Sequence, residues 1–205
     1  MSARAGAADA LQVLRAAQCA AVPWKNGGGL TREVAVHPPG SDVARFDWRV
    51  SIAQIRTSGP FSGFPGVERC MAVLQGRLSL AIDEQAAVSL SPDSAPLAFS
   101  GEVPVFAAPQ GGPVTDLNVM TRRGRCTSRL ARCTVQESAL LETHAGTTLL
   151  IAGSDLLVRC GAVELELGAL DAALIGGGRR CMVISGHAAP YFHLVQIWSA
   201  GQPGG

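Results

Sequence analysis

The sequence is poor in charge and has no long apolar run. Charged residues make up 16% of the 205 residues, and the formal net charge is +1. Proteins that bind nucleic acids concentrate basic residues on one face, whereas the 17 basic residues here are spread along the chain. A membrane helix needs roughly 18–20 consecutive apolar residues, and the longest candidate, Thr147–Leu157, already contains Ser154 and Asp155. We therefore expect neither a nucleic-acid partner nor a membrane association.

Signals for export and for common cofactors are also missing. Asp9 and Arg15 interrupt the apolar residues near the N-terminus before a secretory signal can form. The six cysteines show no C-x-x-C pair and no regular spacing, which favours buried thiols over a disulfide framework. These features predict a cytoplasmic protein with reduced cysteines. The chain lacks a dinucleotide fingerprint, a P-loop and a G-x-S-x-G motif, so we predict no cofactor.

The sequence does contain a series of short strand patterns separated by glycine and proline. In Arg45–Ile55, apolar side chains such as Phe46 and Val50 alternate with polar ones such as Arg49 and Ser51, as in a strand with one buried face. Similar segments follow with turns about every 8–12 residues, a spacing typical of β-sandwiches and barrels. One short helix is expected, at Ala5–Gln18. The predicted fold class is all-β.

An internal repeat refines this prediction. At a shift of 77 residues, Met71–Met120 overlays Thr148–Ile197 without a gap, and matched glycines and leucines recur in it. A β-unit that occurs twice favours a bicupin, which is two tandem double-stranded β-helix (jelly-roll) barrels with little helix. We place an N-terminal barrel with the candidate pocket at residues 1–125 and a structural C-terminal barrel at residues 126–205.

The first candidate site is Pro23–Val36, with the sequence PWKNGGGLTREVAV. Its three glycines allow a tight bend and a nest of N–H groups that suits an anion. Lys25 is the only lysine in a chain with sixteen arginines, and Asn26 is one of two asparagines. The alternative is a hairpin turn with a solvated lysine. Both interpretations stay open at this point.

The second candidate is the stretch where a metal-binding cupin carries G-x5-H-x-H-x3,4-E-x6-G. Counting back from Gly76 puts Arg69 at the glutamate position. The histidine positions fall on Ser62 and Phe64 or, in the shorter spacing, on the residues that directly follow them. None of these can bind a metal, and a guanidinium would repel one. Glu68 is one residue out of register and is expected on the other face of the strand.

Arg69 therefore places a positive charge where a metal would otherwise lie. A cation in a partly apolar cavity needs an anionic partner, because its burial costs several kcal/mol otherwise. Asp116, Glu33 or the carboxylate of a ligand are the alternatives. Arginine suits a carboxylate because its planar fork pairs with both oxygens.

The third candidate is the polar pair Asp116 and Asn118. The two alternate with Leu117 and Val119, so both side chains are expected on one face of a strand. In the overlay Asp116 matches His193, so the pair is not repeated in the second half. A plain solvent-facing strand is the alternative.

These motifs together resemble the HutD/Ves family of small bicupins. The matching segments are PWKNGGGLTREV (Pro23–Val34), FDWRVSIAQI (Phe46–Ile55), GPFSGFPGVER (Gly59–Arg69), LQGRLSL (Leu74–Leu80) and DLNVMTRR (Asp116–Arg123). The resemblance implies a bacterial, cytoplasmic bicupin without the usual cupin metal site. It also implies a link to histidine utilisation, where the proposed role is to bind a pathway intermediate such as formylglutamate or urocanate.

The residues and the resemblance together give one hypothesis, in which the first barrel binds a small anionic metabolite without a metal. The predicted ligand-binding residues are Trp24, Lys25, Asn26, Arg49, Ser51, Phe61, Phe64, Arg69, Asp116 and Asn118. The protein would then sense or modulate a catabolic pathway, and a homodimer is left open.

Two alternative functions are based on other features of the sequence. A metal-free isomerase or lyase acting on a carboxylate would use Asp116 and Lys25 as an acid–base pair. A protein-interaction module would use the arginine-rich stretch Thr121–Arg132.

Overall fold

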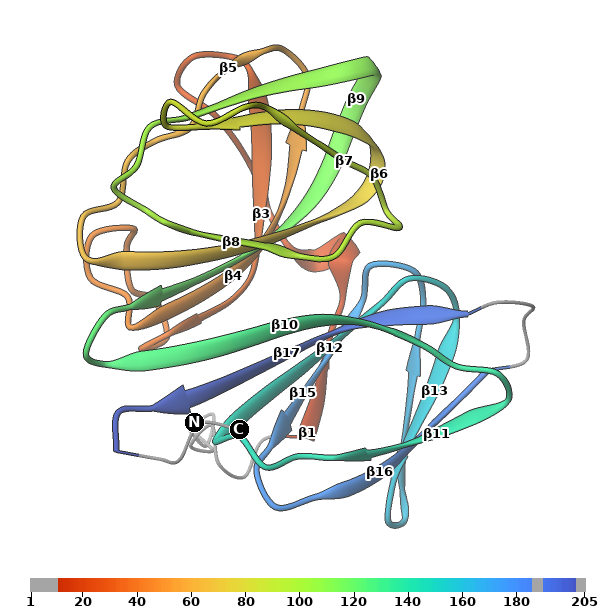
Figure 1. Cartoon of the computed structure of the whole chain (residues 1–205). Helices are drawn as coiled ribbons and strands as arrows, with labels where there is room; N and C mark the ends of the chain where they lie inside the picture. The colour runs from red at the N-terminus through yellow and green to blue at the C-terminus, as the bar shows by residue number, and fades with distance from the viewer. Residues whose placement is uncertain (1–10, 186–189, 202–205) are drawn as a thin grey trace. The chain divides into compact units, whose positions relative to one another are not determined.

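The prediction of an all-β fold is confirmed. The computed structural model describes residues 11–185 and 190–201, which form strands and one short 3-10 helix, Ala16–Gln18 (Figure 1). The chain divides into two compact units, of which the first is Cys19–Cys126. The second contains the described residues up to Gln18 and from Thr127 onward. Within the described ranges, no helix has the length and apolar character that crossing a membrane requires.

The first unit is built around two long bent strands. Its strands are β2 (Ala21–Pro23), β3 (Gly29–His37), β4 (Trp48–Ile55), β5 (Gly59–Pro60), β6 (Val67–Ile82), β7 (Val88–Leu90), β8 (Leu97–Ser100) and β9 (Val105–Arg122). They pair antiparallel in the order β2-β3-β4-β9-β6-β7, and β5 and β8 add to β9 and β6 (Figure 1).

The bend corrects the prediction that glycine separates short strands here. The pairing of β6 with β9 shifts register between Val73 and Gln75 and again between Gln75 and Arg77. Gly76 has a φ of 86° at this point, which suits a residue without a side chain. Glycine therefore marks a bulge inside one strand instead of a turn between two strands. The strands β6 and β9 stay paired on both sides of this bulge.

The second unit consists of two antiparallel sheets. Its strands are β1 (Leu11–Leu14), β10 (Cys126–Thr134), β11 (Ser138–Glu142), β12 (Thr147–Ala152), β13 (Leu156–Cys160), β14 (Val163–Leu167), β15 (Ala172–Gly176), β16 (Arg180–Ile184) and β17 (Tyr191–Ser199). Their orders are β1-β15-β12-β17-β10 and β11-β16-β13-β14. Fully buried side chains such as Leu150, Val158, Ile175 and Val183 form the core between them.

The N-terminal segment departs from the prediction. Its described part, from Leu11, is a strand instead of a helix, and β1 pairs with β15 of the second unit although the sequence placed it in the first barrel. An ion pair of 2.7 Å between Arg15 and Asp171 follows the strand, and Asp171 also accepts from the amide of Ala16. Pairing with a distant strand overrides the local helix preference of an alanine-rich segment.

The expectation of reduced cysteines is wrong for one pair. Cys160 and Cys181 form a disulfide, with their Cα atoms 4.3 Å apart. They occupy the register position next to Arg159 and Met182 in the β13–β16 ladder. Twenty-one residues separate them in sequence, so only the strand pairing brings the two thiols together.

The strand register also corrects the repeat by one residue. Val73 lies opposite Asp116 in the first unit, and its counterpart Leu150 lies opposite Leu194 in the second. Leu194 therefore corresponds to Asp116, and His193 lies on the other face of β17. The conclusion that the second half lacks the polar pair does not change, because a leucine occupies the position.

Candidate functional site

The first unit contains a cavity of about 530 Å³. It is lined by Pro23, Trp24, Lys25, Asn26, Thr31, Val43, Arg49, Ser51, Ala53, Pro60, Phe61, Ser62, Phe64, Arg69, Asp116, Asn118 and Met120. All ten residues that the sequence analysis selected are in this set. Their placement around one cavity is therefore a property of the fold, while their roles in binding stay predictions.

Three neighbouring strands supply the polar wall of the cavity. Ser51 on β4 lies opposite Asn118 on β9, and Arg49 lies opposite Met120 in the same ladder. Met120 in turn lies opposite Arg69 on β6. Because side chains alternate across a strand, these residues share one face. The polar side of the Arg45–Ile55 pattern thus lines a cavity, whereas Val50 on the other face is fully buried.

Arg69 is buried among aromatic rings. Only 7% of the residue is exposed, and its Nη2 donates to Oδ1 of Asn118 at 2.8 Å. Its guanidinium carbon lies 4.9 Å from the ring centre of Phe61, 5.7 Å from Phe64 and 5.0 Å from Phe99. Burial lowers the pKa of Arg69 to about 10, so the side chain remains a cation at neutral pH and the rings stabilise its charge.

Asp116 has no exposed surface. Its Oδ2 accepts a hydrogen bond from Nδ2 of Asn118, while its Oδ1 has no partner among the described residues. Burial raises the pKa of Asp116 to about 7, against the attraction of the Arg69 charge. The Asn118 amide thus links the buried cation to the buried acid, whose ionised form is attracted to Arg69.

The second cationic group of the cavity is already paired. Nε of Arg49 donates to Oε2 of Glu33 at 2.8 Å, with 15% of the arginine side chain exposed. Glu33 therefore pairs with Arg49 and not with Arg69, which removes one of the three alternatives that the sequence left open for the partner of Arg69. Lys25, at the turn between β2 and β3, is exposed.

The glycine-rich turn between β2 and β3 is a hairpin and does not present an open anion nest. The amide of Gly27 donates to the carbonyl of Trp24 at 3.0 Å, and the amide of Gly28 donates to Oδ1 of Asn26 at 3.0 Å. Trp24 is held by a hydrogen bond of 2.8 Å from Nε1 to Thr31. The amides of Gly27 and Gly28 are therefore used within the turn, and the turn contributes the side chains of Lys25 and Asn26 to the cavity lining.

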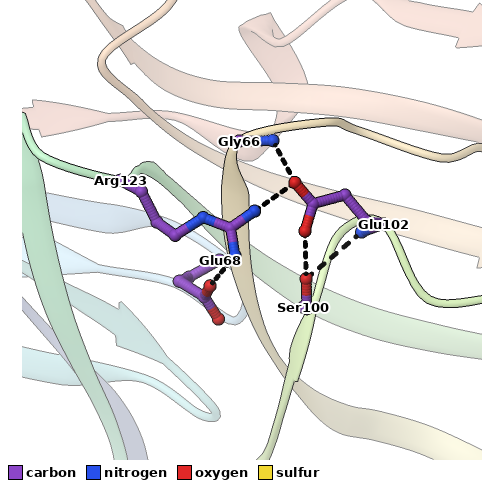
Figure 2. Close-up of polar contacts among 5 residues, drawn as sticks. All are labelled: Gly66, Glu68, Ser100, Glu102 and Arg123. Carbon is purple, nitrogen blue, oxygen red and sulfur yellow. Dashed lines mark hydrogen bonds and ion pairs between the residues drawn. The ribbon is translucent and has the colours of Figure 1, made fainter.

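The loop that carries Phe61 and Phe64 is fixed at several points. The amides of Phe61 and Phe64 donate to the carbonyls of Val105 and Gly101 at 2.8 and 2.7 Å. Figure 2 shows how the loop end is tied by Glu102, which accepts from the amide of Gly66 and from Arg123. These bonds hold the rings against Arg69 without help from a ligand.

The other contacts of this cluster agree with the predicted outward direction of Glu68. Its carboxylate is exposed and pairs with Arg123 at 3.0 Å (Figure 2). Ser100 donates to Oε2 of Glu102 at 2.8 Å. Arg123 and Ser100 hold the pKa of Glu102 well below its usual range.

The residues present do not fit a cupin metal centre. Arg69 lies where the glutamate ligand would be, and the histidine positions carry Ser62 and Phe64, both on the cavity wall. Across residues 11–185 and 190–201, no three His, Cys, Asp or Glu side chains are close enough to hold a metal ion. The cationic side chains of this wall are Arg69 and Arg49, and neither can bind a metal ion.

Some contributors to the site were missed from sequence. Phe99 of β8 lies opposite Arg69 in the β6–β8 ladder and completes its aromatic surroundings. Thr31, Ala53 and Met120 line the cavity as well. Their strand patterns show which residues share a face, but the position of Phe99 beside Arg69 depends on the pairing of β8 with β6.

A comparison with protein families shows which family this chain belongs to. The HutD family model matches residues 16–189. This chain belongs to the HutD family. The sequence is 41% identical over 145 residues to an uncharacterised 21.2 kDa protein from the hutC 3′ region of Pseudomonas putida, which covers 70% of this chain and 74% of that protein. It is 36% identical over 132 residues to the protein Ves of Citrobacter koseri, covering 64% and 68%. HutD family membership links this chain to histidine utilisation.

Solved structures agree with this relationship. A conserved protein of unknown function from Pseudomonas aeruginosa PAO1 has a TM-score of 0.85 and 31% identity, over 93% of this chain and all of that one. HutD from Pseudomonas fluorescens SBW25, solved in a formate condition, has a TM-score of 0.79 and 31% identity, over 94% and 100%. A likeness to an oxalate decarboxylase of Bacillus subtilis, with a TM-score of 0.67 at 9% identity, shows the fold alone. The predicted cupin-type fold is confirmed.

Proposed function

We propose that this HutD family protein binds a small carboxylate-bearing metabolite in the cavity of its first unit, without a metal, and so senses or modulates histidine utilisation. The observation that carries the proposal is Arg69, a buried cation on the wall of a cavity. A guanidinium has five N–H donors in a planar fork, and one of them is used by Asn118. Its Nε is buried without a hydrogen-bond partner among the described residues.

A ligand carboxylate would complete the hydrogen bonds of Arg69. A charge-assisted pair with a carboxylate is about twice as strong as a neutral hydrogen bond and fixes the orientation of the anion. The Phe61 and Phe64 rings exclude water from the guanidinium, which strengthens this attraction. The cavity of about 530 Å³ lies within the range of small-molecule sites.

The proposed ligands are intermediates of histidine degradation such as formylglutamate or urocanate. Each combines a carboxylate with a further polar group, and the cavity offers Ser51 and Asn26 beside the cations. The related HutD from Pseudomonas fluorescens was solved in a formate condition, and formate is the smallest carboxylate. The choice of a carboxylate as ligand for this chain rests on Arg69.

Enzymatic turnover is the weaker alternative. An acid–base pair would need both Asp116 and Lys25 to reach the substrate. Asp116 has no exposed surface and Lys25 is exposed, not desolvated. Neither group is placed as a catalyst of this kind requires, so binding is favoured.

The arginine-rich stretch supports the fold more than a partner surface. Arg122 donates to the carbonyls of Phe46 and Ala44 at 3.0 and 2.8 Å. Arg125 pairs with Asp47 at 2.7 Å. Together with the Arg123 ion pairs, these contacts use the three arginines of the stretch that belong to the first unit, which argues against a protein-interaction module.

The proposal is tested by calorimetry and thermal shift with metal-stripped protein. The ligands are formate, urocanate, formylglutamate, formiminoglutamate, glutamate and histidine. A ligand at 100 times its Kd stabilises the fold by about 2.7 kcal/mol, a shift of several degrees in Tm. Arg69→Ala should lose binding with an unchanged circular dichroism spectrum, while Arg77→Ala, an exposed arginine on the same strand, should bind like wild type.

Two outcomes contradict the proposal. Equal Kd values for wild type and Arg69→Ala would place the ligand elsewhere. A Tm shift with zinc, iron or manganese, together with no shift from any carboxylate, would show that the site takes a metal instead.

A further inference from the structure

Arg69 is the buried cation of the cavity, and Asp116 and a ligand carboxylate would both interact with it. Arg69 is linked to Asp116 by the hydrogen bonds of Asn118, and Arg49 is hydrogen-bonded directly to Glu33. An incoming carboxylate that pairs with Arg69 would lie close to a second, fully buried carboxylate. Two like charges at one buried site cannot both stay ionised at ordinary cost, and one of them takes up a proton.

We propose that Asp116 takes up one proton when a carboxylate ligand pairs with Arg69, so that the cavity binds an anion together with a proton. The proton comes from solvent and is bound by a carboxylate oxygen of Asp116, and no covalent bond other than this O–H is made or broken. The inference rests on the proposed function and adds to it how binding responds to pH.

Asp116 is the group best placed to take the proton. Its neighbours in the ladders are Ala53 on β4 and Val73 on β6, and neither can compensate a buried charge. Its Oδ1 has no hydrogen-bond donor among the described residues, so an O–H formed there breaks no existing bond.

The other charged groups around the cavity are paired or exposed. Glu33 is paired directly with Arg49 and has 41% of its side chain exposed. Arg69 stays protonated, with a pKa of about 10. The exposed Lys25 lies at the turn. A ligand carboxylate on Arg69 adds to the burial that already raises the pKa of Asp116 to about 7.

The linkage has a definite sign. Below the pKa of Asp116 in the free protein, the proton is already present and binding is independent of pH. Above it, ligand binding requires proton uptake, and affinity falls tenfold for each pH unit until the pKa of the bound state is reached. With a free pKa of about 7, the effect appears above neutrality.

The test is calorimetry with N-formyl-L-glutamate and, separately, glutarate at pH 8 in two buffers of different ionisation enthalpy. Both probes are fully ionised from pH 7 upward, so protons that they carry do not contribute. Wild type should take up close to one proton per ligand, and its Kd should rise about tenfold between pH 7.5 and pH 8.5. Asp116→Asn should bind without proton uptake and with a constant Kd, while Asp83→Asn, an exposed aspartate of the same unit, should behave like wild type.

A second readout uses the wild-type protein and needs no folded variant. The carboxyl 13C resonance of Asp116 at pH 8 should move from the carboxylate to the carboxylic-acid range when N-formyl-L-glutamate saturates the site. Binding without proton uptake, or uptake that persists in Asp116→Asn, would overturn this inference and leave the proposed function standing. No binding of either probe between pH 5.5 and pH 8.5 would reject the proposed function, and this inference with it.

Discussion

Arg69 and Asp116 are joined through a single side-chain amide. Asn118 accepts from the arginine with its oxygen and donates to the acid with its nitrogen. The three residues come from two adjacent strands, and the link keeps a buried charge pair apart and oriented. A carboxylate ligand would have to use the face of Arg69 that this link leaves free.

Changing the amide to an acid should close the site to anions. Asn118→Asp places a carboxylate about where Oδ1 now lies, 2.8 Å from Nη2 of Arg69. The new buried ion pair competes with the ligand carboxylate, so the affinity for N-formyl-L-glutamate should fall on the order of 100-fold or more. Calorimetry measures the change. The control is Gln110→Glu, an exposed position on β9 with the same change of charge, and equal losses in both variants would contradict the assignment.

Removing the partner of Arg49 should strengthen binding. Glu33→Gln leaves Arg49 without its ion pair and adds one positive charge to the cavity wall. For a partly exposed pair we expect a gain of about 3- to 10-fold in affinity for a dicarboxylate, because the pair itself contributes on the order of 1 kcal/mol. The gain should shrink in high salt. Glu68→Gln also removes a carboxylate that pairs with an arginine, but on the outward side of β6, where Arg123 keeps its pair with Glu102. A similar gain there would indicate a general charge effect.

The turn beneath the aromatic loop should tolerate no side chain at Gly101. A Cβ there would lie 2.7 Å from the carbonyl oxygen of Phe64 and 2.8 Å from that of Val67. Gly101→Ala should therefore cost about 1–3 kcal/mol of stability and weaken ligand binding by moving Phe64. At Gly63, in the same loop, the nearest atom is 3.9 Å away, so Gly63→Ala should leave both Tm and Kd unchanged. A Gly101→Ala protein with wild-type Tm would show that the loop adapts freely.

Acid should destabilise the protein through His193. This residue is 1% exposed, and burial, followed by the charge of Arg132, lowers its pKa to about 4. An unfolded histidine titrates near 6.5, so the unfolded state binds more protons between these values. Stability is full above pH 6.5 and falls by about 2 kcal/mol between pH 7 and pH 5. Urea unfolding across this range should show a flatter acid limb for His193→Leu than for wild type.

The matched control for this effect is His144. Three quarters of its side chain is exposed, so His144→Leu should keep the acid sensitivity of wild type. If His193→Leu retains that sensitivity as well, another group is responsible for it.

Alternation along single strands was enough to select four of the cavity residues. Asp116 and Asn118, or Arg49 and Ser51, share a face because side chains repeat every second residue in any strand. The cupin motif spacing placed Arg69 where a metal ligand would stand. These are local or fixed-distance relationships, and they need no knowledge of the pairing.

Features that depend on pairing between distant strands were missed or wrong. The sequence pattern around Leu11–Leu14 predicts a helix, and the segment forms a strand instead because it pairs with β15. The Cys160–Cys181 disulfide and the contact of Phe99 with Arg69 arise in the same way. In the repeat, a gapless overlay assigned His193 to the wrong face, since a shift of one residue moves every following side chain to the other face of the strand.

The sequence alone predicts that this protein is all-β, which face of each strand is polar, and that an arginine replaces a cupin metal ligand. Which charges meet depends on the tertiary structure. Glu33 pairs with Arg49, Asp116 serves Arg69 through Asn118, and three phenylalanine rings surround that cation. The physical reason is that a strand's alternation is set by its own backbone, whereas register, bend and burial are set by partners far away in sequence.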